Sequence, residues 1–282
     1  MKALVCFHDN CPDGFTAAWA VWKSLGDAAE YRAVNYGQAL PTDIAGRDVI
    51  LVDFSYPRAQ LDLMADAAKS VQVYDHHKTA QADLDGWTRG KVVFDMERSG
   101  AGIAWDEFHQ GEATWLGVRP NLISYVEDRD LWRWELRDSR EISEYIFSLP
   151  RDFQTWDRLG VCLGGNAAPV SPGFIAAVES GAALLRAKKI RVAEICKNAR
   201  WVQLAGHRIP LVNTAWDFSE IGEYLCEQFP DASFAGYYFD RKDVRQFGFR
   251  SRAGFDVSEV CKVYGGGGHA AAAGFTSSLG WL

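Results

Sequence analysis

The first 75 residues alternate between short apolar runs and longer amphipathic segments. Most of the apolar runs are nearly continuous, as in strands that are covered on both faces, and the segments between them repeat apolar residues at helical spacing. This alternation predicts an α/β fold whose N-terminal sheet is mostly parallel and flanked by helices. The predicted strands are residues 2–7, 31–36, 48–54 and 71–75, and the predicted helices are residues 15–25 and 57–69.

The middle of the chain is more helical, and a second α/β pattern follows it. Ser99 is a candidate N-cap, and Gly and Pro residues interrupt the apolar pattern between residues 160 and 173. The expected elements are an extended stretch at 92–95, helices at 99–109, 119–136, 172–199 and 218–229, a loop at 160–173, strands at 207–214, 233–240 and 244–251, and a turn near 255–265.

These patterns predict two α/β domains that are joined by a helix. A chain of 282 residues is long enough for two ordinary domains. We assign residues 1–170 to an N-terminal domain, residues 171–200 to a helical linker and residues 201–282 to a smaller C-terminal α/β domain.

Three of the N-terminal strands end in residues that can bind metal or phosphate. His8 follows the first strand, Asp53 the third, and Asp75, His76 and His77 the fourth. Open α/β sheets bind their ligands beyond the carboxyl ends of the strands. We therefore expect these side chains to converge on one rim of the N-terminal sheet.

The net charge restricts the class of partner. The chain has 30 Lys and Arg residues against 37 Asp and Glu residues, which gives a formal charge of −7. Proteins that track long nucleic-acid duplexes usually carry a basic face. The acidic balance argues against that class and favours a small anionic substrate, held by a few basic groups or by metal ions.

The cysteines and the apolar segments indicate the compartment. The six cysteines include no C-x-x-C pair and no zinc-finger spacing, and several lie in apolar runs, which predicts buried free thiols in a reducing compartment. The first apolar run is too short for a signal peptide, and no run approaches the ~20 apolar residues of a membrane helix. We expect a soluble cytoplasmic protein without a membrane partner.

A set of carboxylates and imidazoles predicts a divalent-metal site. Each residue alone could be a helix cap, a turn former or a solvated charge, but so many clustered carboxylates would repel one another without compensation. Asp and His ligands suit manganese or a similar ion, and two ions ~3.5–4 Å apart would share a bridging carboxylate and activate a water. The candidates are His8, Asp13, Asp53, Asp75, His76, His77 and Asp128.

Four consecutive glycines precede His269, and an Ala-rich stretch follows it. A flexible turn would account for the glycines alone. Because the Ala-rich stretch is competent to form a helix, we expect the backbone N–H groups of this segment to approach an anion near a helix N-terminus. Arg250, in the predicted strand 244–251, offers a guanidinium fork that suits a phosphate.

Five motifs, in this order along the chain, resemble those of the DHH phosphoesterase superfamily with its DHH-associated C-terminal domain. They are HDNCPDGF from His8, VDF from Val52, YDHH from Tyr74, VEDRD from Val126 and GGGGHAAAAGF from Gly265. The resemblance covers nearly the whole chain, and it points to the group of RecJ-like exonucleases and nanoRNases. The superfamily also includes cyclic-dinucleotide phosphodiesterases, exopolyphosphatases and manganese inorganic pyrophosphatases.

The resemblance implies roles for the matching residues of the first four motifs. Asp53 matches the carboxylate that bridges two metals, and His77 matches the histidine that contacts phosphate. Asp75 matches a metal ligand or a carboxylate that orients one, so the implied catalytic residues are His77, Asp53 and Asp75. The implied metal ligands are His8, Asp13, Asp53, Asp75, His76 and Asp128, with Asp130 as the competing choice for Asp128.

The resemblance also implies a substrate-binding role for the C-terminal domain, across an interdomain cleft from the metals. Arg250 matches the substrate-binding arginine, with Arg252 as the alternative, and Gly267, Gly268 and His269 belong to the segment that holds the substrate.

The first motif departs from the family pattern. The family usually carries two aspartates separated by one residue, and Cys11 stands in place of the earlier one. Cys11, Asp9 or Asn10 could take over as the ligand, and a thiolate would favour a softer ion.

The function implied is hydrolysis of phosphodiester bonds in short single-stranded oligonucleotides or dinucleotides by a water that two divalent ions activate. Manganese is the expected ion, with magnesium or cobalt as alternatives, and a homodimer is an open alternative to a monomer. The competing functions are a phosphomonoesterase or exopolyphosphatase and, from a different class, a nucleotide-binding sensor whose weakened active site would explain Cys11.

Overall fold

The computed structural model describes residues 1–109, 119–164, 171–252 and 254–281. These residues form two compact units, Met1–Leu185 and Arg186–Leu282. Helix α8 (Pro172–Cys196) begins in the first unit and ends in the second.

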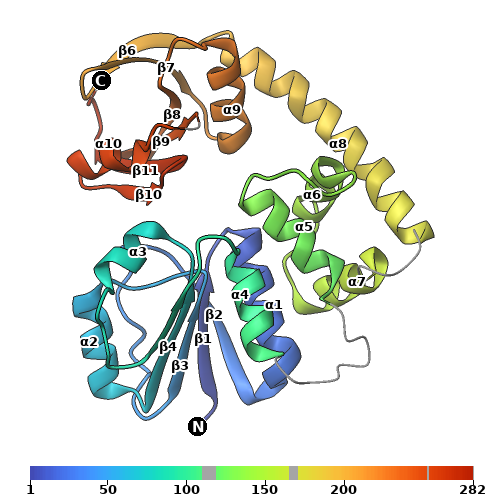
Figure 1. Cartoon of the computed structure of the whole chain (residues 1–282), viewed down its shortest axis with the longest axis vertical. Helices are drawn as coiled ribbons and strands as arrows, with labels where there is room; N and C mark the ends of the chain where they lie inside the picture. Colours follow the sequence, from blue (N-terminus) through green and yellow to red (C-terminus); the bar gives the residue numbers. More distant parts are fainter. Residues whose placement is uncertain (110–118, 165–170, 253, 282) are drawn as a thin grey trace. The chain divides into compact units, whose positions relative to one another are not determined.

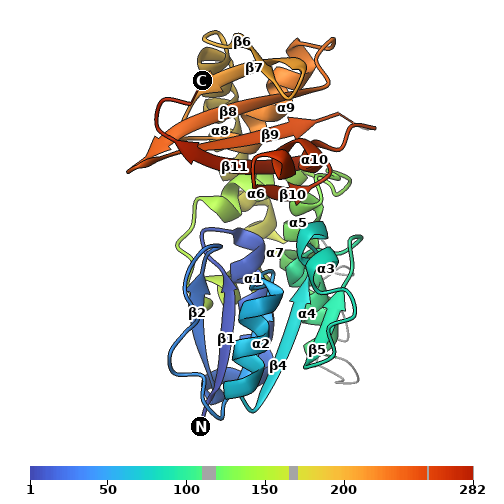
Figure 2. The same cartoon turned by 90° about the vertical axis from the view of Figure 1, so that its left-hand side faces the viewer.

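The first unit is built on a five-stranded parallel sheet. Its strands are β1 (Ala3–His8), β2 (Ala29–Val34), β3 (Asp48–Val52), β4 (Ser70–Asp75) and β5 (Lys91–Phe94). They are ordered β2-β1-β3-β4-β5, and every neighbouring pair is parallel (Figures 1 and 2). The predicted N-terminal α/β fold is confirmed, and the extended stretch at 92–95 is the edge strand β5.

Both faces of this sheet are buried, because alternate residues of each strand enter different cores. In β3, Ile50 and Val52 pack on the side of α1 (Pro12–Leu25) and α4 (Gly100–Phe108), and Val49 and Leu51 pack on the side of α2 (Arg58–Ala67). Figure 1 shows these helices on opposite faces of the sheet. Four consecutive apolar residues in one strand are therefore the expected sequence of a central parallel strand.

Further helices complete the first unit. Ser99 caps α4 as predicted, because its side chain accepts a hydrogen bond from the Gly102 N–H at 3.2 Å. A 3₁₀ turn (Gly26–Ala28) follows α1. The remaining helices are α3 (Lys78–Asp83), α5 (Asn121–Asp130), α6 (Ser139–Phe147) and α7 (Phe153–Leu163).

The helix predicted over 119–136 and the loop predicted over 160–173 have different ends in the structure. The helix expected over 119–136 ends at Asp130, because the following residues turn back onto it: the backbone N–H of Arg133 donates to the Asp128 carbonyl, and both Trp132 and Trp134 have positive φ. The loop expected over 160–173 begins later, since α7 continues to Leu163 and includes Gly160. Residues 165–170 of that prediction lie outside the described residues.

The second unit contains a six-stranded mixed sheet. Its strands are ordered β10-β11-β9-β8-β7-β6, and the β7–β8 pair is its parallel one. α9 (Phe218–Gln228) covers one face and the short α10 (Val257–Val263), within the predicted turn, covers the other. The strands are β6 (Arg200–Leu204), β7 (His207–Asn213), β8 (Phe234–Arg241), β9 (Val244–Ser251), β10 (Gly267–His269) and β11 (Ala272–Ser278).

The Ala-rich stretch after His269 is a strand, and the predicted helix N-terminus is wrong. Residues Ala272–Ser278 form β11, which pairs antiparallel with both β9 and β10. Burial decides this outcome, because Ala273 and Phe275 alternate into a core with Phe247 and Phe249. Gly268 lies within β10 opposite Ala273 of β11; its φ is 141°, and a Cβ there would lie 2.5 Å from the Ala272 carbonyl oxygen.

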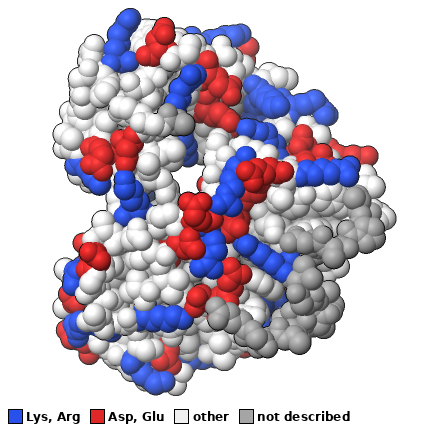
Figure 3. Space-filling model, in the orientation of Figure 1, with Lys and Arg blue, Asp and Glu red and all other residues white. Residues whose placement is uncertain are grey.

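The surface charge of the described residues is mixed. Lys and Arg side chains are interspersed with Asp and Glu side chains on the face drawn in Figure 3. Among the described residues, none of the helices combines the length and the apolar composition needed to cross a bilayer. The six cysteines are free, as predicted; four of them are buried, whereas Cys11 and Cys162 are partly exposed.

Candidate metal centre

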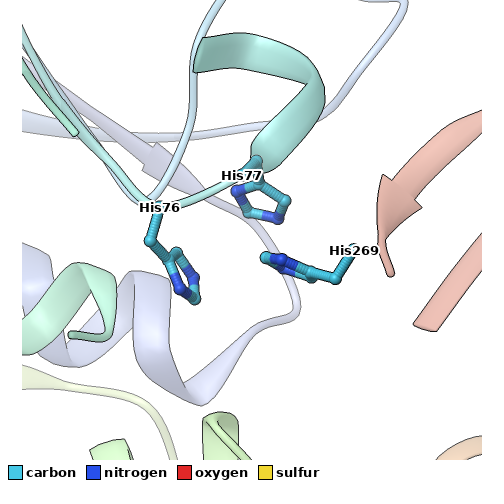
Figure 4. A group of neighbouring side chains, drawn as sticks. All are labelled: His76, His77 and His269. Carbon is cyan, nitrogen blue, oxygen red and sulfur yellow. The ribbon is translucent and has the colours of Figure 1, made fainter. Parts of the chain in front are cut away.

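The order of the strands in the first sheet brings the predicted site residues together. β3 lies between β1 and β4, so the residues at the carboxyl ends of these three strands are neighbours. His8 ends β1, Asp53 follows β3, and His76 and His77 follow β4, with His77 at the start of α3 (Figure 4). The strand order therefore brings His8, Asp53 and Asp75 to one rim of the sheet, as predicted.

Asp53 is at the centre of this group. The chain turns sharply after β3, where Asp53 has a φ of 52° and its N–H donates to the Tyr74 carbonyl at 2.9 Å. Its carboxylate is 1% exposed. One oxygen, Oδ1, lies 3.2 Å from Nε2 of His76, and the other, Oδ2, lies 3.6 Å from Nδ1 of His8. A carboxylate that faces a different imidazole with each oxygen has the arrangement of a bridging ligand.

Asp13 reaches the same group from the first turn of α1. The helix begins at Pro12, earlier than predicted, because proline is favoured at the first helical position. The Asp13 carboxylate accepts hydrogen bonds from the N–H groups of Gly100 and Ala101 at 2.7 and 3.0 Å, which fixes it against the N-terminus of α4. Its Oδ2 lies 3.7 Å from Nε2 of His76.

The fourth motif contributes Asp130 to this group, and not Asp128. Oδ2 of Asp130 lies 3.4 Å from Nε2 of His76. The Asp128 carboxylate instead accepts hydrogen bonds from the N–H groups of Glu135 and Leu136, at 2.9 and 3.4 Å, and from the Ser139 hydroxyl. Asp128 thus stabilises the turn after α5, so the candidate ligand set contains the competing residue Asp130.

Asp75 holds the two histidines that follow it. Its Oδ1 lies 2.7 Å from Nδ1 of His77 and accepts hydrogen bonds from the N–H groups of His76 and His77 at 2.7 and 3.3 Å. The Asp75 side chain is fully buried. This carboxylate therefore sets the course of the chain through the DHH triplet and the orientation of the His77 ring.

The charges of this group depend on one another. Burial and the neighbouring Asp53 and Asp130 raise the pKa of Asp13 well above its usual range. Burial opposes ionisation of Asp53 too, but its contacts with His76 and His8 outweigh burial and hold the pKa of Asp53 well below its usual range. Burial also opposes protonation of His76, yet the three carboxylates around it raise its pKa to about 11. Without a metal, protonated His76 provides the positive charge that offsets the negative charge of the neighbouring carboxylates.

The donor atoms of the first unit fit divalent cations. Three groups of side chains in this unit bring their ligand atoms within 4.8 Å of one another, and Asp53 belongs to each of them. Asp53 Oδ2, His8 Nδ1 and Asp75 Oδ2 are buried and make no hydrogen bond to another described residue, although such atoms are normally satisfied. The three groups are His8, Cys11 and Asp53; Asp13, Asp53 and His76; and Asp53, Asp75 and His77.

Two glycines at this site were not identified from the sequence. A Cβ on Gly14 would lie 2.5 Å from the His8 carbonyl oxygen, and a Cβ on Gly100 would lie 2.4 Å from the Asp53 Cβ. Both glycines let a helix approach the sheet rim closely. The HDNCPDGF motif contains the first, and the helix start SGAG from Ser99 contained the signal for the second.

Tyr36 also was not identified. Its ring packs against those of His8 and His77, with centroids 5.4 and 5.9 Å apart, and it follows β2 at the same edge of the sheet. Its position at the end of the predicted strand 31–36 was the available signal.

The predicted substrate-binding residues belong to the second unit. Arg250 lies on β9, where its Nη2 donates to the Ser219 hydroxyl at 2.6 Å and its Nη1 donates to the Phe249 carbonyl at 3.2 Å. Nη2 of Arg252, the alternative, donates to the Cys226 carbonyl. Gly267, Gly268 and His269 form β10, and all three are partly exposed. Their roles toward a substrate stay predictions.

Comparison with known proteins first gives a relative of unknown function. The chain is 27% identical to the uncharacterized protein R106 of Acanthamoeba polyphaga mimivirus over an alignment 298 positions long, gaps included, which covers 98% of this chain and 67% of that protein. No family model matches the chain.

Solved structures establish the fold. The DHH domain of a member of a family of ribosomal proteins matches with a TM-score of 0.66 at 15% identity, over 98% of this chain and 83% of that chain. The exonuclease RecJ bound to manganese matches with a TM-score of 0.51 at 14% identity, over 98% and 86% of the two chains. RecJ from Thermus thermophilus in complex with Mn²⁺ has a TM-score of 0.50 at 16% identity, over 98% and 50%. The chain has the fold of DHH-domain proteins, as the motifs implied.

Proposed function

We propose that this chain, with its DHH fold, is a divalent-metal-dependent phosphoesterase that hydrolyses phosphodiester bonds in short oligonucleotides or dinucleotides. One observation carries the proposal. Asp53 is buried at the centre of three overlapping groups of donor atoms, and one of its oxygens has no hydrogen-bond partner among the described residues. A shared carboxylate of this kind is what a two-metal site requires.

The residues divide between two metal positions. His8 and Asp53 would hold one ion, and Asp13, Asp53, His76 and Asp130 would surround the other. Manganese, which suits Asp and His ligands, is the proposed ion, and it is bound in the RecJ structures named above. When bound, such ions would lower the pKa of a water and polarise a phosphoryl oxygen.

His77 in the first unit and a group of residues in the second unit would orient the substrate and neutralise its charge. Asp75 holds Nδ1 of His77 at 2.7 Å, so a phosphate contact by His77 would use Nε2. Burial opposes protonation of His77, but Asp75 raises the pKa of this ring, so it would donate a hydrogen bond to a phosphoryl oxygen. In the second unit, Arg250 would bind a phosphate with the guanidinium fork that Ser219 orients, and Gly267, Gly268 and His269 are the further proposed substrate-binding residues.

Two observations favour a short nucleotide substrate. The formal charge of the chain is −7, whereas proteins that follow a long duplex usually carry a basic surface. RecJ, which shares the fold, is an exonuclease. A short single-stranded oligonucleotide or a dinucleotide would need only the metals and a few basic groups.

A substrate panel with Mn²⁺ tests the proposal. It contains a linear dinucleotide, a longer single-stranded oligonucleotide, a cyclic dinucleotide, polyphosphate and a nucleoside monophosphate. We expect the highest kcat/KM for the dinucleotide or the oligonucleotide, with mononucleotides as products. Preference for polyphosphate or the monophosphate would reassign the substrate class. Binding of nucleotides without turnover of any substrate would show the sensor function instead.

The variant Asp53→Ala is the control for this panel. It should lose turnover by several orders of magnitude while the circular dichroism spectrum stays that of the unaltered chain. A variant that keeps most of its turnover would exclude Asp53 as the shared ligand.

A further inference from the structure

We infer that Cys11 is a metal ligand and that its sulfur makes one metal position of this chain selective for a softer divalent ion, such as Co²⁺ or Zn²⁺, over Mn²⁺. The inference rests on the metal centre of the proposed function and assigns one of its ligands. It concerns the position formed by His8, Cys11 and Asp53.

The three side chains are arranged as the ligands of one ion. Their donor atoms all lie within 4.8 Å of one another. Nδ1 of His8 and Oδ2 of Asp53 are 3.6 Å apart, and bonds of ~2.1 Å from these atoms to a single ion would form an angle of about 120°. This angle is close to that of a tetrahedral site, the usual geometry for zinc with sulfur and nitrogen ligands.

Two atoms of the group need a partner that the described residues do not provide. Asp53 is 1% exposed, yet its Oδ2 makes no hydrogen bond, and Nδ1 of His8 is also buried without one. A buried carboxylate oxygen that accepts no hydrogen bond is costly. Oδ2 of Asp53 lies 3.6 Å from Nδ1 of His8, which is an ion-pair distance but too long for a hydrogen bond, and within 4.8 Å of the Cys11 sulfur. A cation bound between these three atoms would satisfy both buried atoms.

The neighbouring residues that could replace Cys11 are engaged elsewhere. The Asp9 carboxylate accepts hydrogen bonds from the Asn10 backbone N–H at 2.8 Å, from the Asn10 side chain at 2.9 Å and from the Asn35 side chain at 3.1 Å. Asn10 has a φ of 56° and an exposed side chain. The turn between β1 and α1 thus holds Asp9 and Asn10 in its own hydrogen bonds, and of the three candidates Cys11 is the one grouped with His8 and Asp53.

The consequence is a difference in chemistry between the two metal positions. Sulfur is a soft ligand that favours ions such as zinc and cobalt, whereas carboxylates suit manganese and magnesium. The position around Asp13, Asp53 and His76 has no sulfur ligand among the described residues. The chain would therefore bind two ions with different preferences, joined by Asp53.

Co²⁺ binding to the 282-residue chain tests the inference, with a readout that does not depend on activity. Co²⁺ is titrated into the metal-free protein, and the visible d–d bands report bound cobalt while a near-ultraviolet charge-transfer band reports a cobalt–sulfur bond. The unaltered chain should show both. Cys11→Ser and Cys11→Asp should keep the d–d bands and lose the charge-transfer band.

Two further comparisons complete the test. Cys162→Ser removes the other partly exposed thiol, outside the group, and should leave both signals unchanged. In competition titrations, Cys11→Asp should shift the preference for Co²⁺ over Mn²⁺ toward Mn²⁺ on the order of tenfold.

The outcomes separate this inference from the proposed function. Visible d–d bands without a charge-transfer band, or a charge-transfer band that survives in Cys11→Ser, would overturn the assignment of Cys11 and leave the metal centre standing. Absence of any cobalt binding would overturn both the assignment and the metal centre.

Discussion

At the scale of single residues, two aspartates of one motif have different tasks. Asp128 and Asp130 are two positions apart on α5, so their side chains leave the helix in different directions. Asp128 turns toward the segment after the helix and caps it, and Asp130 faces His76. The sequence alone does not distinguish Asp128 from Asp130, whereas their contacts in the structure do.

We predict that Asp128→Ala mainly lowers stability and that Asp130→Ala mainly lowers metal affinity. Asp128→Ala should lower the free energy of unfolding of the metal-free chain by about 1–3 kcal/mol, because it removes the acceptor of two backbone N–H groups and of the buried Ser139 hydroxyl. Asp130→Ala should lower Mn²⁺ affinity by about tenfold or more with a smaller change in stability. Denaturant unfolding and metal titration of both variants measure the two effects. The reverse result would return Asp128 to the metal centre.

Arg250 is the second residue whose task can be tested directly. Replacing it by Ala removes the guanidinium that Ser219 orients, so we expect KM to rise and kcat/KM to fall, with a smaller effect on kcat. Arg250→Lys keeps the charge without the planar fork and should recover only part of the loss. Steady-state kinetics on the best dinucleotide substrate measure both. Unchanged kinetics in Arg250→Ala would remove this residue from substrate binding.

At the scale of elements, the site depends on how closely helices approach the rim of the sheet. The N-termini of α1 and α4 reach Asp53 through glycines, and the Asp13 carboxylate links the two helices by accepting hydrogen bonds from the first N–H groups of α4. Glycine is needed at positions 14 and 100 because the backbone of each helix lies directly against Asp53 and leaves no room for a side chain.

Gly100→Ala tests this close approach. Its Cβ would lie 2.4 Å from the Asp53 Cβ and 2.9 Å from its Cα, so α4 or the turn after β3 must move. We expect a loss of stability of about 1–3 kcal/mol and a fall in Mn²⁺ affinity of about tenfold or more. Thermal unfolding and metal titration measure both quantities.

Gly160→Ala is the matched control. Gly160 lies within α7, and the nearest atom to an added Cβ, on Trp19, is 3.5 Å away. Alanine is favoured over glycine in a helix by about 0.5–1 kcal/mol, so this variant should keep its metal affinity and its stability. Equal behaviour of the two variants would contradict the close approach of α4 to Asp53.

At the scale of the whole molecule, the candidate metal centre belongs to the first of two compact units, and Arg250 and His269 belong to the second. Each unit has its own sheet and its own pair of buried cores. Chains with two such units often unfold in more than one transition. A ligand stabilises the unit that binds it, so metal binding should affect the two transitions differently.

Calorimetry with and without Mn²⁺ checks this expectation. A metal at a hundredfold excess over its Kd adds about 2.7 kcal/mol to the stability of the folded state, and EDTA should remove this gain. The transition of the first unit should move to higher temperature, and Asp53→Ala should abolish the shift. A thermogram that Mn²⁺ does not change would contradict the metal centre.

The sequence by itself determined the N-terminal fold and most members of the site. Continuous apolar runs encode strands that are buried on both faces, and the residues after parallel strands must meet at one edge, so His8, Asp53 and the triplet could be placed together from spacing alone. The order of five motifs was sufficient to indicate the DHH fold, which the structural comparison confirms.

Tertiary structure decided what local pattern could not. The Ala-rich segment after His269 has helical propensity, but pairing with β9 and burial of Phe275 make it a strand, because long-range packing outweighs propensity. The end of α5 depended on acceptors that Asp128 provides across a turn. The inference that Cys11, and not Asp9 or Asn10, is a metal ligand likewise rests on hydrogen bonds within the turn after β1 and on a buried oxygen of Asp53. Each of these outcomes depends on contacts that sequence spacing does not specify.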